Sequence, residues 1–578
     1  MPTARSGGQI LVDTLVTQGV DVVFGVPGES YLAVLDALHD APIKFISNRQ
    51  EGGAAFMAEA YGKLTGRPGI CFVTRGPGAT NASIGVHTAQ QDSTPMILFI
   101  GQVGGDFVER EAFQEIDYRR MFGQMAKWVA QIDRAERIPE YVARAFQVAT
   151  SGRPGPVVLA LPEDMLTALA TVADVAKVLP VQAAPAPAQM AQVHALLSAA
   201  QRPVVLLGGG GWTHQACDDL QRFVEHAKLS VACAFRFQDL FDNAHRNYIG
   251  DVGIGINPHL AAQIQQADLI LAIGPRLGEM TTGGYTLLRA PRPQQQLIHV
   301  HAGAEELGRV YQADLMINSG MAEFAAALVT LPALDCSRWS DGVASARAAY
   351  LAWQGQPDLF AEPSTKLNLW AVMQTLRATL PRDTVLTNGA GNFASWGHRF
   401  WQYGNRKVGL RTQLAPTSGA MGYGVPAGIA AALIGKVEQR PRSVLTLAGD
   451  GDYMMNGQEL ATAVQYGAGV LFVIFNNNMY GTIRMHQERH YPARVSGTTL
   501  QNPDFAALAR AYGAFGEVVD ATEQFSATLQ RALAHIASND GPALIELRYD
   551  GNLTTPSATL MSMRDAALLA QQAQAGQQ

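Results

Sequence analysis

The chain has 578 residues, of which 48% are apolar and 16% charged, and its formal net charge is −6. This composition is typical of compact globular proteins, and the length exceeds what one hydrophobic core usually supports, which predicts about three domains. No long block of one charge sign appears, so neither nucleic acid nor an anionic membrane surface is expected as a partner.

The four cysteines lie far apart, and no two of them form a C-x-x-C pair. A zinc site and a disulfide framework are therefore not predicted. No run of about eighteen apolar residues suits a membrane span, and the N-terminal residues do not resemble a secretory leader. We expect a cytoplasmic protein.

Short apolar runs alternate with alanine-rich amphipathic segments in the first part of the chain. The expected strands are residues 22–24, 44–46, 69–73, 96–100 and 155–162. Such alternation predicts a parallel sheet with helices on both faces. We assign residues 1–170 to this first domain, and we expect an extended linker over residues 179–188, which contain three prolines.

The same alternation predicts two further domains, so the expected fold class is α/β with three doubly wound parallel-sheet domains. The second domain is placed at residues 190–335, with strands at 203–207, 269–274 and 296–300. A less ordered stretch is expected over residues 335–363. The third domain is placed at residues 365–560, with a tail at 561–578 that resembles a frayed helix, and its strands are expected at 384–387, 443–448, 470–475 and 543–547.

Two polar motifs follow two of these strands. Asp450 lies in a Gly-Asp-Gly-Asp run directly after residues 443–448, and Asn477 lies in an Asn-Asn-Asn run after residues 470–475, twenty-seven positions on (477 minus 450). Carboxylate and amide oxygens suit Mg²⁺, and the carboxyl ends of parallel strands are where open α/β sheets bind ligands. Either motif alone is typical of a plain turn, but the pair predicts a site for a metal and a diphosphate.

This pairing resembles the signature of the thiamine-diphosphate-dependent enzymes. The resemblance implies that Asp450, Asn477 and the backbone carbonyl of Met479 hold Mg²⁺, which in turn binds the diphosphate. It also implies that the flanking residues contact thiamine diphosphate, namely Gly449, Gly451, Asp452, Tyr480, Gly481 and Thr482.

Glu51 follows a predicted strand and begins a helix rich in small residues, where the helix dipole favours a carboxylate. Taken alone it is an ordinary carboxylate at a helix N-terminus. The resemblance implies that Glu51 of one subunit hydrogen-bonds the aminopyrimidine of the cofactor held by the other subunit, and so promotes removal of the thiazolium C2 proton. The turns expected near the pyrimidine contain Pro27, Gly28, Thr74, Gly76 and Asn81.

In the third domain, Met421 matches the bulky apolar residue that props the cofactor into its V shape, although a lone methionine is more often a core residue. The loop Gly391-Asn392-Phe393-Ala394 occupies the place of a Gly-Gln-His-Gln loop near the cofactor. This change alters the polar groups expected over the thiazolium ring.

Within the superfamily, residues 8–550 resemble acetolactate (acetohydroxyacid) synthases most closely. Phe113 and Gln114 match residues that line the substrate pocket there, and Lys127 lies where those enzymes also have a lysine. The resemblance implies decarboxylation of a 2-oxo acid, pyruvate above all, and carboligation to a second carbonyl. It also implies a homodimer or homotetramer with active sites between subunits, and it leaves open whether a regulatory small subunit binds.

Several positions differ from the synthase pattern. His486 replaces a tryptophan that favours 2-oxobutyrate as acceptor, and Glu163 reverses the charge of a lysine near the expected channel. Many of these synthases bind FAD in the central domain, and the glycines at 208–210 are compatible with a nucleotide. However, His301 stands near the place of the acid expected to bind the ribose, which argues against FAD.

Three alternatives stay open. One is a non-oxidative 2-oxo acid decarboxylase or a 2-hydroxyacyl lyase of the same superfamily, although the tandem histidines of pyruvate decarboxylases are absent from residues 85–92. Another is a non-catalytic cofactor-binding paralogue, against which Glu51 and the complete metal signature argue. The third is a redox enzyme built on the glycines at 208–211.

Overall fold

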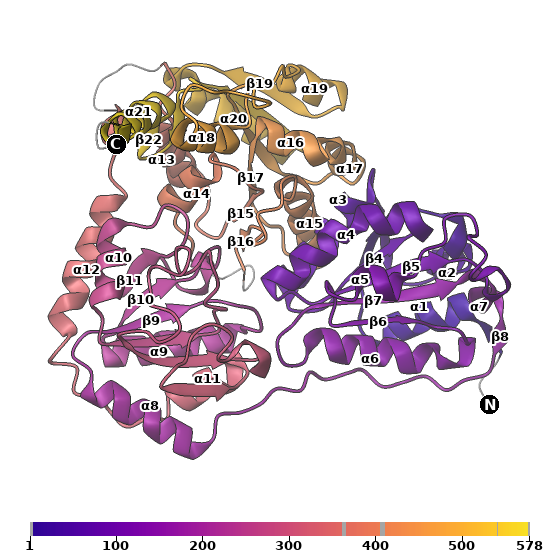
Figure 1. The fold of residues 1–578 in the computed structure, drawn as a ribbon. Helices are drawn as coiled ribbons and strands as arrows, with labels where there is room; N and C mark the ends of the chain where they lie inside the picture. The colour runs from indigo at the N-terminus through magenta and orange to yellow at the C-terminus, as the bar shows by residue number, and fades with distance from the viewer. Residues whose placement is uncertain (1–3, 361–365, 405–410, 540, 576–578) are drawn as a thin grey trace. The chain divides into compact units, whose positions relative to one another are not determined.

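Three six-stranded parallel sheets form the framework of the protein (Figure 1). The structure, a computed structural model, describes residues 4–360, 366–404, 411–539 and 541–575. Its internal contacts divide the chain into two units: the first holds the chain up to Tyr350 with two short later segments, and the second holds most of the rest. The predicted α/β class with three parallel sheets is confirmed. The predicted domain boundaries remain predictions.

The first sheet contains every strand predicted for it and one more, β6. Its four inner strands are buried on both faces, as expected of parallel strands covered by helices, whereas the two edge strands are partly exposed. The order across the sheet is β3 (Lys44–Ser47), β2 (Val22–Gly25), β4 (Gly69–Val73), β5 (Met96–Gln102), β7 (Pro156–Pro162) and β6 (Trp128–Gln131). A short antiparallel pair joins β1 (Arg5–Ser6) to β8 (Leu169–Ala170).

Two groups of helices cover this sheet, with α3 and α4 on one face and α1 and α6 on the other (Figure 1). Helix α3 is almost wholly buried, because its alanines and glycines let it pack closely. The helices are α1 (Gly7–Thr17), α2 (Leu32–His39), α3 (Glu51–Thr65), α4 (Arg75–Asp92), α5 (Tyr118–Phe122), α6 (Ile138–Thr150) and α7 (Glu163–Thr167).

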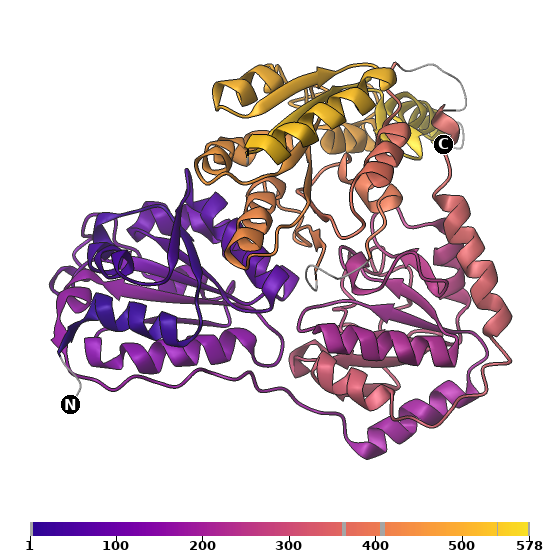
Figure 2. The ribbon, with the colours of Figure 1, turned by 180° about the vertical axis from the view of Figure 1, so that it is seen from behind.

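The second sheet belongs to the same unit and is flanked by helices on both sides (Figure 2). Its strands are, in order, β11 (Tyr248–Asp251), β10 (Ser230–Cys233), β9 (Pro203–Leu207), β12 (Leu269–Ile273), β13 (Gln296–His301) and β14 (Leu315–Asn318). Its helices are α8 (Pro187–Ala199), α9 (His214–Ala227), α10 (Pro258–Gln266) and α11 (Met321–Leu328).

The two segments expected to be extended or less ordered, residues 179–188 and 335–363, both contain helical residues. Helix α8 begins at Pro187, inside the expected linker, because a proline is well tolerated in the first turn of a helix. The less ordered stretch expected over 335–363 was wrong for its middle, where α12 (Ser340–Trp353) forms and buries Val343 and Tyr350. Residues 361–363 of that stretch lie outside the described residues.

The third sheet forms the second unit and places the two motif strands side by side. In order, its strands are β16 (Gln413–Leu414), β15 (Val385–Asn388), β17 (Val444–Gly449), β18 (Leu471–Asn476), β20 (Ala543–Arg548) and β19 (Phe515–Val519). Its helices are α13 (Leu369–Thr379), α14 (Ala394–Phe400), α15 (Gly424–Val437), α16 (Asp450–Asn456), α17 (Leu460–Gln465), α18 (Gly481–His490), α19 (Phe505–Ala511) and α20 (Thr522–Asn539).

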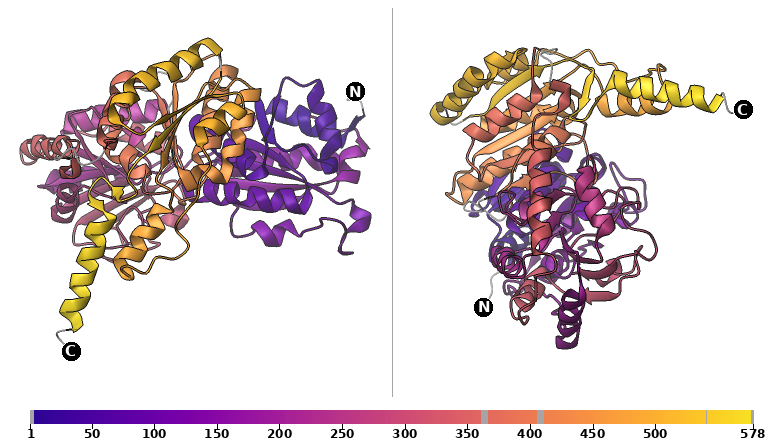
Figure 3. Two further views of the ribbon diagram at one scale, coloured as in Figure 1. Left: turned by 90° about the horizontal axis from the view of Figure 1, so that it is seen from above. Right: turned by 90° about the vertical axis from the view of Figure 1, so that its left-hand side faces the viewer.

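The described part of the predicted tail is helical. A small hairpin of β21 (Leu553–Thr555) and β22 (Ala558–Thr559) leads into α21 (Leu560–Ala575), which extends away from its unit (Figure 3). Arg564 of α21 forms an ion pair with the buried Glu488 of α18. Among the described residues, no helix combines the length and the apolar character that a membrane span requires.

Candidate active site

The structure brings the predicted metal ligands together at the carboxyl ends of β17 and β18. These strands pair in parallel, and Gly449 lies opposite Phe475. Asp450, the next residue, is 3% exposed, and its Oδ1 accepts a hydrogen bond from the N–H of Gly451 at 2.8 Å. Its Oδ2 accepts from the N–H of Met479 at 3.3 Å. The turn after β18 thus folds back onto the Asp450 carboxylate.

The Asp450 carboxylate is buried without a cationic neighbour. Among the described residues, no lysine or arginine forms an ion pair with it, and its partners are amide donors. Burial raises its pKa above the ordinary value, and hydrogen bonds from Gly451, Asn502 and Met479 oppose that rise. Because buried charges are normally paired or bind metals, this environment fits a cation at Asp450.

Two backbone hydrogen bonds pair the residues around Met479 with residues 498–500 in an antiparallel arrangement. The N–H of Leu500 donates to the carbonyl of Asn478 at 2.8 Å, and the N–H of Tyr480 donates to the carbonyl of Thr498 at 2.9 Å. These bonds flank Met479 in an antiparallel bridge with Thr499. In an extended strand the N–H and C=O of one residue point to the same side. The Met479 carbonyl therefore faces the side on which its N–H meets Asp450.

Asn477, the remaining predicted ligand, lies near Tyr549, which follows β20. Burial raises the pKa of the Tyr549 hydroxyl, and the Asn477 side chain opposes that rise. Across the described residues, no group of three His, Cys, Asp or Glu side chains is placed to hold a metal. A metal here would depend on the mixed oxygen set of Asp450, Asn477 and Met479, which is the type of set that Mg²⁺ accepts.

Asp452 braces two loops that the sequence assigned to the cofactor. Its Oδ1 accepts from the N–H of Ala390 at 3.0 Å and from the N–H of Gly422 at 2.8 Å. Gly422 follows Met421, so the predicted cofactor support is anchored to α16. A Cβ at Gly389 would collide with the Asp452 carboxylate, which is why this turn needs glycine.

The loop after β15 is clamped through Asn392. The N–H of Asn392 donates to Thr482 Oγ1 at 2.9 Å, the hydroxyl of Thr482 donates to Asn392 Oδ1 at 3.0 Å, and Nδ2 donates to Thr554 Oγ1 at 2.6 Å. Phe393 and Ala394 are buried in the hydrophobic core. Asn392 therefore joins the Gly391 loop, α18 and β21, whereas Phe393 packs inward.

Glu51 lies in the first turn of α3 and is bound by a residue that the sequence also selected. The carboxamide of Asn81, on α4, donates to Glu51 Oε2 at 2.9 Å. Nearby, Thr74 Oγ1 and Ser30 Oγ lie 2.7 Å apart, and a Cβ at Gly28 would collide with the Thr74 side chain. The predicted pyrimidine-side residues thus form one group at the carboxyl ends of β2 and β4, with Pro27 exposed beside them.

The expected substrate residues of the first unit lie in different settings. Phe113 is 73% exposed, and Gln114 has a φ of 66° while its carbonyl accepts from the N–H of Gly76 at 2.9 Å. Lys127 is engaged elsewhere: its Nζ donates to the carbonyls of Ser151 at 2.9 Å and Arg153 at 2.8 Å, just beyond the end of α6. Its role toward substrate stays a prediction, and the structure shows a local role at this helix end.

Two residues that differ from the synthase pattern, Glu163 and His486, contact other side chains in the structure. Glu163 forms an ion pair with the buried Arg75 at 2.8 Å, so the reversed charge is satisfied within its own unit. His486 lies on α18 next to His490, with nearly parallel rings whose centroids are 6.2 Å apart. Burial and the neighbouring Arg489 and His490 lower the pKa of His486 below its ordinary value.

The glycine-rich strand ends of the second sheet pack closely against each other. A Cβ at Gly209 would collide with the Gly274 carbonyl, so the ends of β9 and β12 already touch each other. The indole N–H of Trp212 donates to the Gly208 carbonyl at 2.9 Å.

An ion-pair cluster centred on Glu306 lies just after β13 of the second sheet. Glu306, whose side chain is 2% exposed, lies 2.5 Å from Arg153, 3.1 Å from Arg309 and 3.5 Å from Arg276. Burial raises the pKa of Glu306, but the three guanidinium groups lower it by more. The pKa of Glu306 therefore lies below its ordinary value. The glycines at 208–210 therefore serve close packing within the protein.

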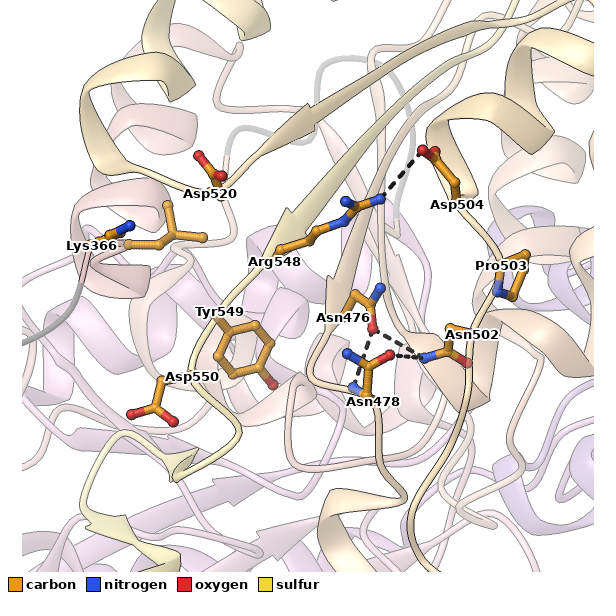
Figure 4. Close-up of a pocket in the computed structure, with 11 residues that line it drawn as sticks. Lys366, Asn476, Asn478, Asn502, Pro503, Asp504, Asp520, Arg548, Tyr549 and Asp550 are labelled. Carbon is orange, nitrogen blue, oxygen red and sulfur yellow. Dashed lines mark hydrogen bonds and ion pairs between the residues drawn. The ribbon is translucent and has the colours of Figure 1, made fainter.

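The structure adds site residues that sequence reasoning missed. Asn502 donates to Asp450 Oδ2 at 2.8 Å, and Tyr549 and Thr554 contact Asn477 and Asn392. A cavity of about 620 Å³ lies beside them, lined by residues that include Asn476, Asn478, Asn502 and Tyr549 (Figure 4). Asn502, Tyr549 and Thr554 belong to no recognisable motif, and only the tertiary fold brings them to the strand ends.

Comparisons with known proteins agree with this geometry. Three segments match thiamine pyrophosphate enzyme families: residues 5–121 match the N-terminal TPP binding domain, residues 190–328 the central domain, and residues 389–547 the C-terminal TPP binding domain. Thiamine pyrophosphate is another name for thiamine diphosphate.

Whole-chain relatives point the same way. The chain is 31% identical to the probable acetolactate synthase large subunit of Methanocaldococcus jannaschii, over 94% of this chain and 92% of that protein. It is 30% identical to the acetolactate synthase isozyme 2 large subunit of Escherichia coli, over 94% and 96%. It is also 30% identical to the mitochondrial acetolactate synthase catalytic subunit of Saccharomyces cerevisiae, over 94% and 81%. The chain therefore belongs to the thiamine pyrophosphate enzymes and is an acetolactate synthase-like member of that family.

Proposed function

We propose that the protein decarboxylates a 2-oxo acid, with pyruvate as donor, and joins the remaining fragment to a second carbonyl compound. The observation that carries this proposal is the convergence of Asp450, Asn477 and the Met479 backbone at the ends of β17 and β18. The names of its relatives, which are acetolactate synthases, support the same reaction. A decarboxylase that releases an aldehyde is the second candidate.

The chain's own groups would hold the cofactor in two places. Asp450, Asn477 and the Met479 carbonyl would bind Mg²⁺ and through it the diphosphate, while Met421, anchored through Gly422 to Asp452, would support the rings. When bound, thiamine diphosphate supplies an electron sink for the pair released as carbon dioxide leaves. The hard chemistry belongs to the cofactor, and the protein orients it.

Glu51 would manage the proton at the pyrimidine. The hydrogen bond from Asn81 fixes one oxygen of its carboxylate, which leaves the other oxygen for the cofactor. A carboxylate held in this way can keep a proton next to a ring nitrogen without rotating away. Phe113 and Gln114 would face the substrate, and His486 would take part in selecting the acceptor.

We propose a homodimer as the smallest active form, and a tetramer remains compatible. Glu51 and Asp450 belong to different units, and the family resemblance places such halves on neighbouring subunits. The residues after Asp452 support an interface there, because Met454 and Met455 are 50% and 46% exposed on α16. Apolar side chains exposed next to a site are typical of a surface that another chain covers.

We infer further that the protein works without FAD. The close approach of Gly209 to Gly274 and the Glu306 ion-pair cluster support this inference, because they bring protein atoms together at the strand ends where open α/β sheets bind nucleotides. Protein purified after growth with riboflavin should release no stoichiometric flavin on denaturation. Flavin at one equivalent per chain would contradict this inference.

The main proposal is tested with thiamine diphosphate, Mg²⁺ and a panel of 2-oxo acids, with products identified by mass. Acetolactate from pyruvate is the expected product, and Glu51→Gln should abolish its formation. Aldehyde alone would favour the decarboxylase. Absence of carbon dioxide release from every 2-oxo acid in the wild type would overturn both functions.

A further inference from the structure

Asn502 contacts three residues of the proposed metal site through one carboxamide. Its Nδ2 lies 2.8 Å from Asp450 Oδ2, 3.0 Å from Asn476 Oδ1 and 3.3 Å from Asn478 Oδ1. Figure 4 shows the carboxamides of Asn476, Asn478 and Asn502 converging at the wall of the cavity. The two amide hydrogens of Asn502 are thus shared among acceptors that belong to the ends of two different strands.

The acceptors are themselves fixed on their other sides. Asn476 Nδ2 donates to the buried Glu546 at 2.8 Å, and Asn476 Oδ1 also accepts from the N–H of Asn478 at 3.2 Å. Asn502 is therefore the side chain that connects this arrangement to Asp450. Among the described residues, Asn502 supplies the one side-chain hydrogen bond to the Asp450 carboxylate, since the other donors are backbone amides.

The backbone that carries Asn502 reinforces this link. Residues 498–500 run beside residues 478–480 through the bonds from Leu500 to Asn478 and from Tyr480 to Thr498. The same short ladder orients the Met479 carbonyl. Residues 498–502 therefore contact both the Asp450 carboxylate and the backbone that carries the Met479 carbonyl.

We propose that Asn502 is a positioning residue for the metal: its carboxamide fixes the Asp450 carboxylate and the 476–479 turn in the geometry that binds Mg²⁺ with the cofactor diphosphate. This inference rests on the proposed function, because it presumes that Asp450, Asn477 and Met479 bind the metal. Groups that orient metal ligands typically contribute 10- to 100-fold to affinity. Removal of Asn502 should therefore weaken Mg²⁺ binding by about that factor.

The test is calorimetric titration of Mg²⁺ into the full chain in the presence of thiamine diphosphate, with Mn²⁺ and its electron paramagnetic resonance signal as an independent probe. Asn502→Ala should raise the metal dissociation constant at least tenfold, and raising the Mg²⁺ concentration should restore most of the activity that the variant loses. Asn502→Leu retains more volume and should behave in the same way. The matched control is Asn368→Ala, which removes the N-cap hydrogen bond to Ala371 at the start of α13 and should leave metal affinity unchanged.

The outcomes separate this inference from the proposed function. If the wild type bound no Mg²⁺ in the presence of thiamine diphosphate, the proposed metal site itself would be wrong. A wild type and Asn502 variants with equal metal affinity would overturn the positioning role alone. If both Asn502 variants failed to fold without cofactor while the Asn368 variant folded, Asn502 would serve the fold, and the proposal would also fall.

Discussion

The carboxamide of Asn81 donates a hydrogen bond to the carboxylate of Glu51 over 2.9 Å, and so joins the second turn of α4 to the first turn of α3. A hydrogen bond to a charged group contributes roughly 1.5–3 kcal/mol. Since this bond orients the proposed proton-handling group, its loss should affect turnover more than cofactor binding.

We therefore predict that Asn81→Leu lowers kcat by about 10- to 100-fold, the factor that corresponds to this bond energy. The dissociation constant of thiamine diphosphate should change far less. Steady-state kinetics and fluorescence titration measure the two effects. Ser83→Ala is the control, because its hydroxyl donates only to the Thr80 carbonyl of the same helix; a similar loss in both variants would contradict the prediction.

Gly389→Ala should destabilise the second unit, because the added Cβ would collide with the Asp452 carboxylate. We expect the free energy of unfolding to fall by about 1–3 kcal/mol, as at other overpacked sites. Cofactor binding should also weaken, because the hydrogen bond between Asp452 and the N–H of Gly422 would shift. Thermal unfolding with and without thiamine diphosphate measures both effects. Gly342→Ala is the control: it lies in α12 with open space around its Cβ, so alanine there should be neutral or stabilising.

His486→Trp should shift acceptor choice toward 2-oxobutyrate. The larger apolar ring would offer more contact to an acceptor with an added methylene, a difference worth about 10-fold or more. Competition between pyruvate and 2-oxobutyrate, with the two products quantified by mass, measures the shift. His490→Trp, one helical turn away on α18, should leave the ratio unchanged; an unchanged ratio in the His486 variant would remove His486 from the acceptor pocket.

The first unit should lose stability in mild acid. Burial lowers the pKa of both His299 and His301 below the ordinary value of 6.5. The unfolded chain therefore binds protons that the folded chain does not, so this contribution is present above pH 6.5 and is lost as the pH falls below it. His301→Asn should reduce the slope of unfolding free energy against pH, whereas His39→Asn, at an exposed position, should not.

Glutamate at Met454 and Met455 together should dissociate the proposed dimer. Two charges in a buried interface cost several kcal/mol when they are left unpaired. Light scattering should show monomers, and activity should fall with the fraction of dimer. Met561→Glu, at a 61% exposed position on α21, is the control; a double variant that remains dimeric would place the interface elsewhere.

Sequence patterns located the sheets and the metal motif because both depend on local order along the chain. Strands such as β17 and β18 are long apolar runs, and Asp450 and Asn477 follow them directly. The missed strands are short or broken by polar residues: β16 has two residues, and β19 contains Gly516 and Glu517. Their pairing depends on neighbours distant in sequence.

The same distinction separates the predicted from the missed site residues. Asn502 meets Asp450 across 52 positions, with no motif around it that marks this contact. Phe393 and Lys127 were selected by likeness to relatives, yet the first is buried in the core and the second holds backbone carbonyls near the end of α6. Likeness to relatives selects a loop by its place in the sequence, but side-chain direction depends on packing.

The clamp between Asn392 and Thr554 also bears on how the protein is made. The two residues are 162 positions apart, so the ribosome synthesises the loop of Asn392 long before its partner. Until Thr554 emerges, the carboxamide of Asn392 can bond only to Thr482 and Met485 of α18 among its described partners, so the loop expected near the cofactor is only partly fastened. The Asn392 loop therefore reaches its final form late in synthesis, after the strands that carry Asp450 and Asn477 are complete.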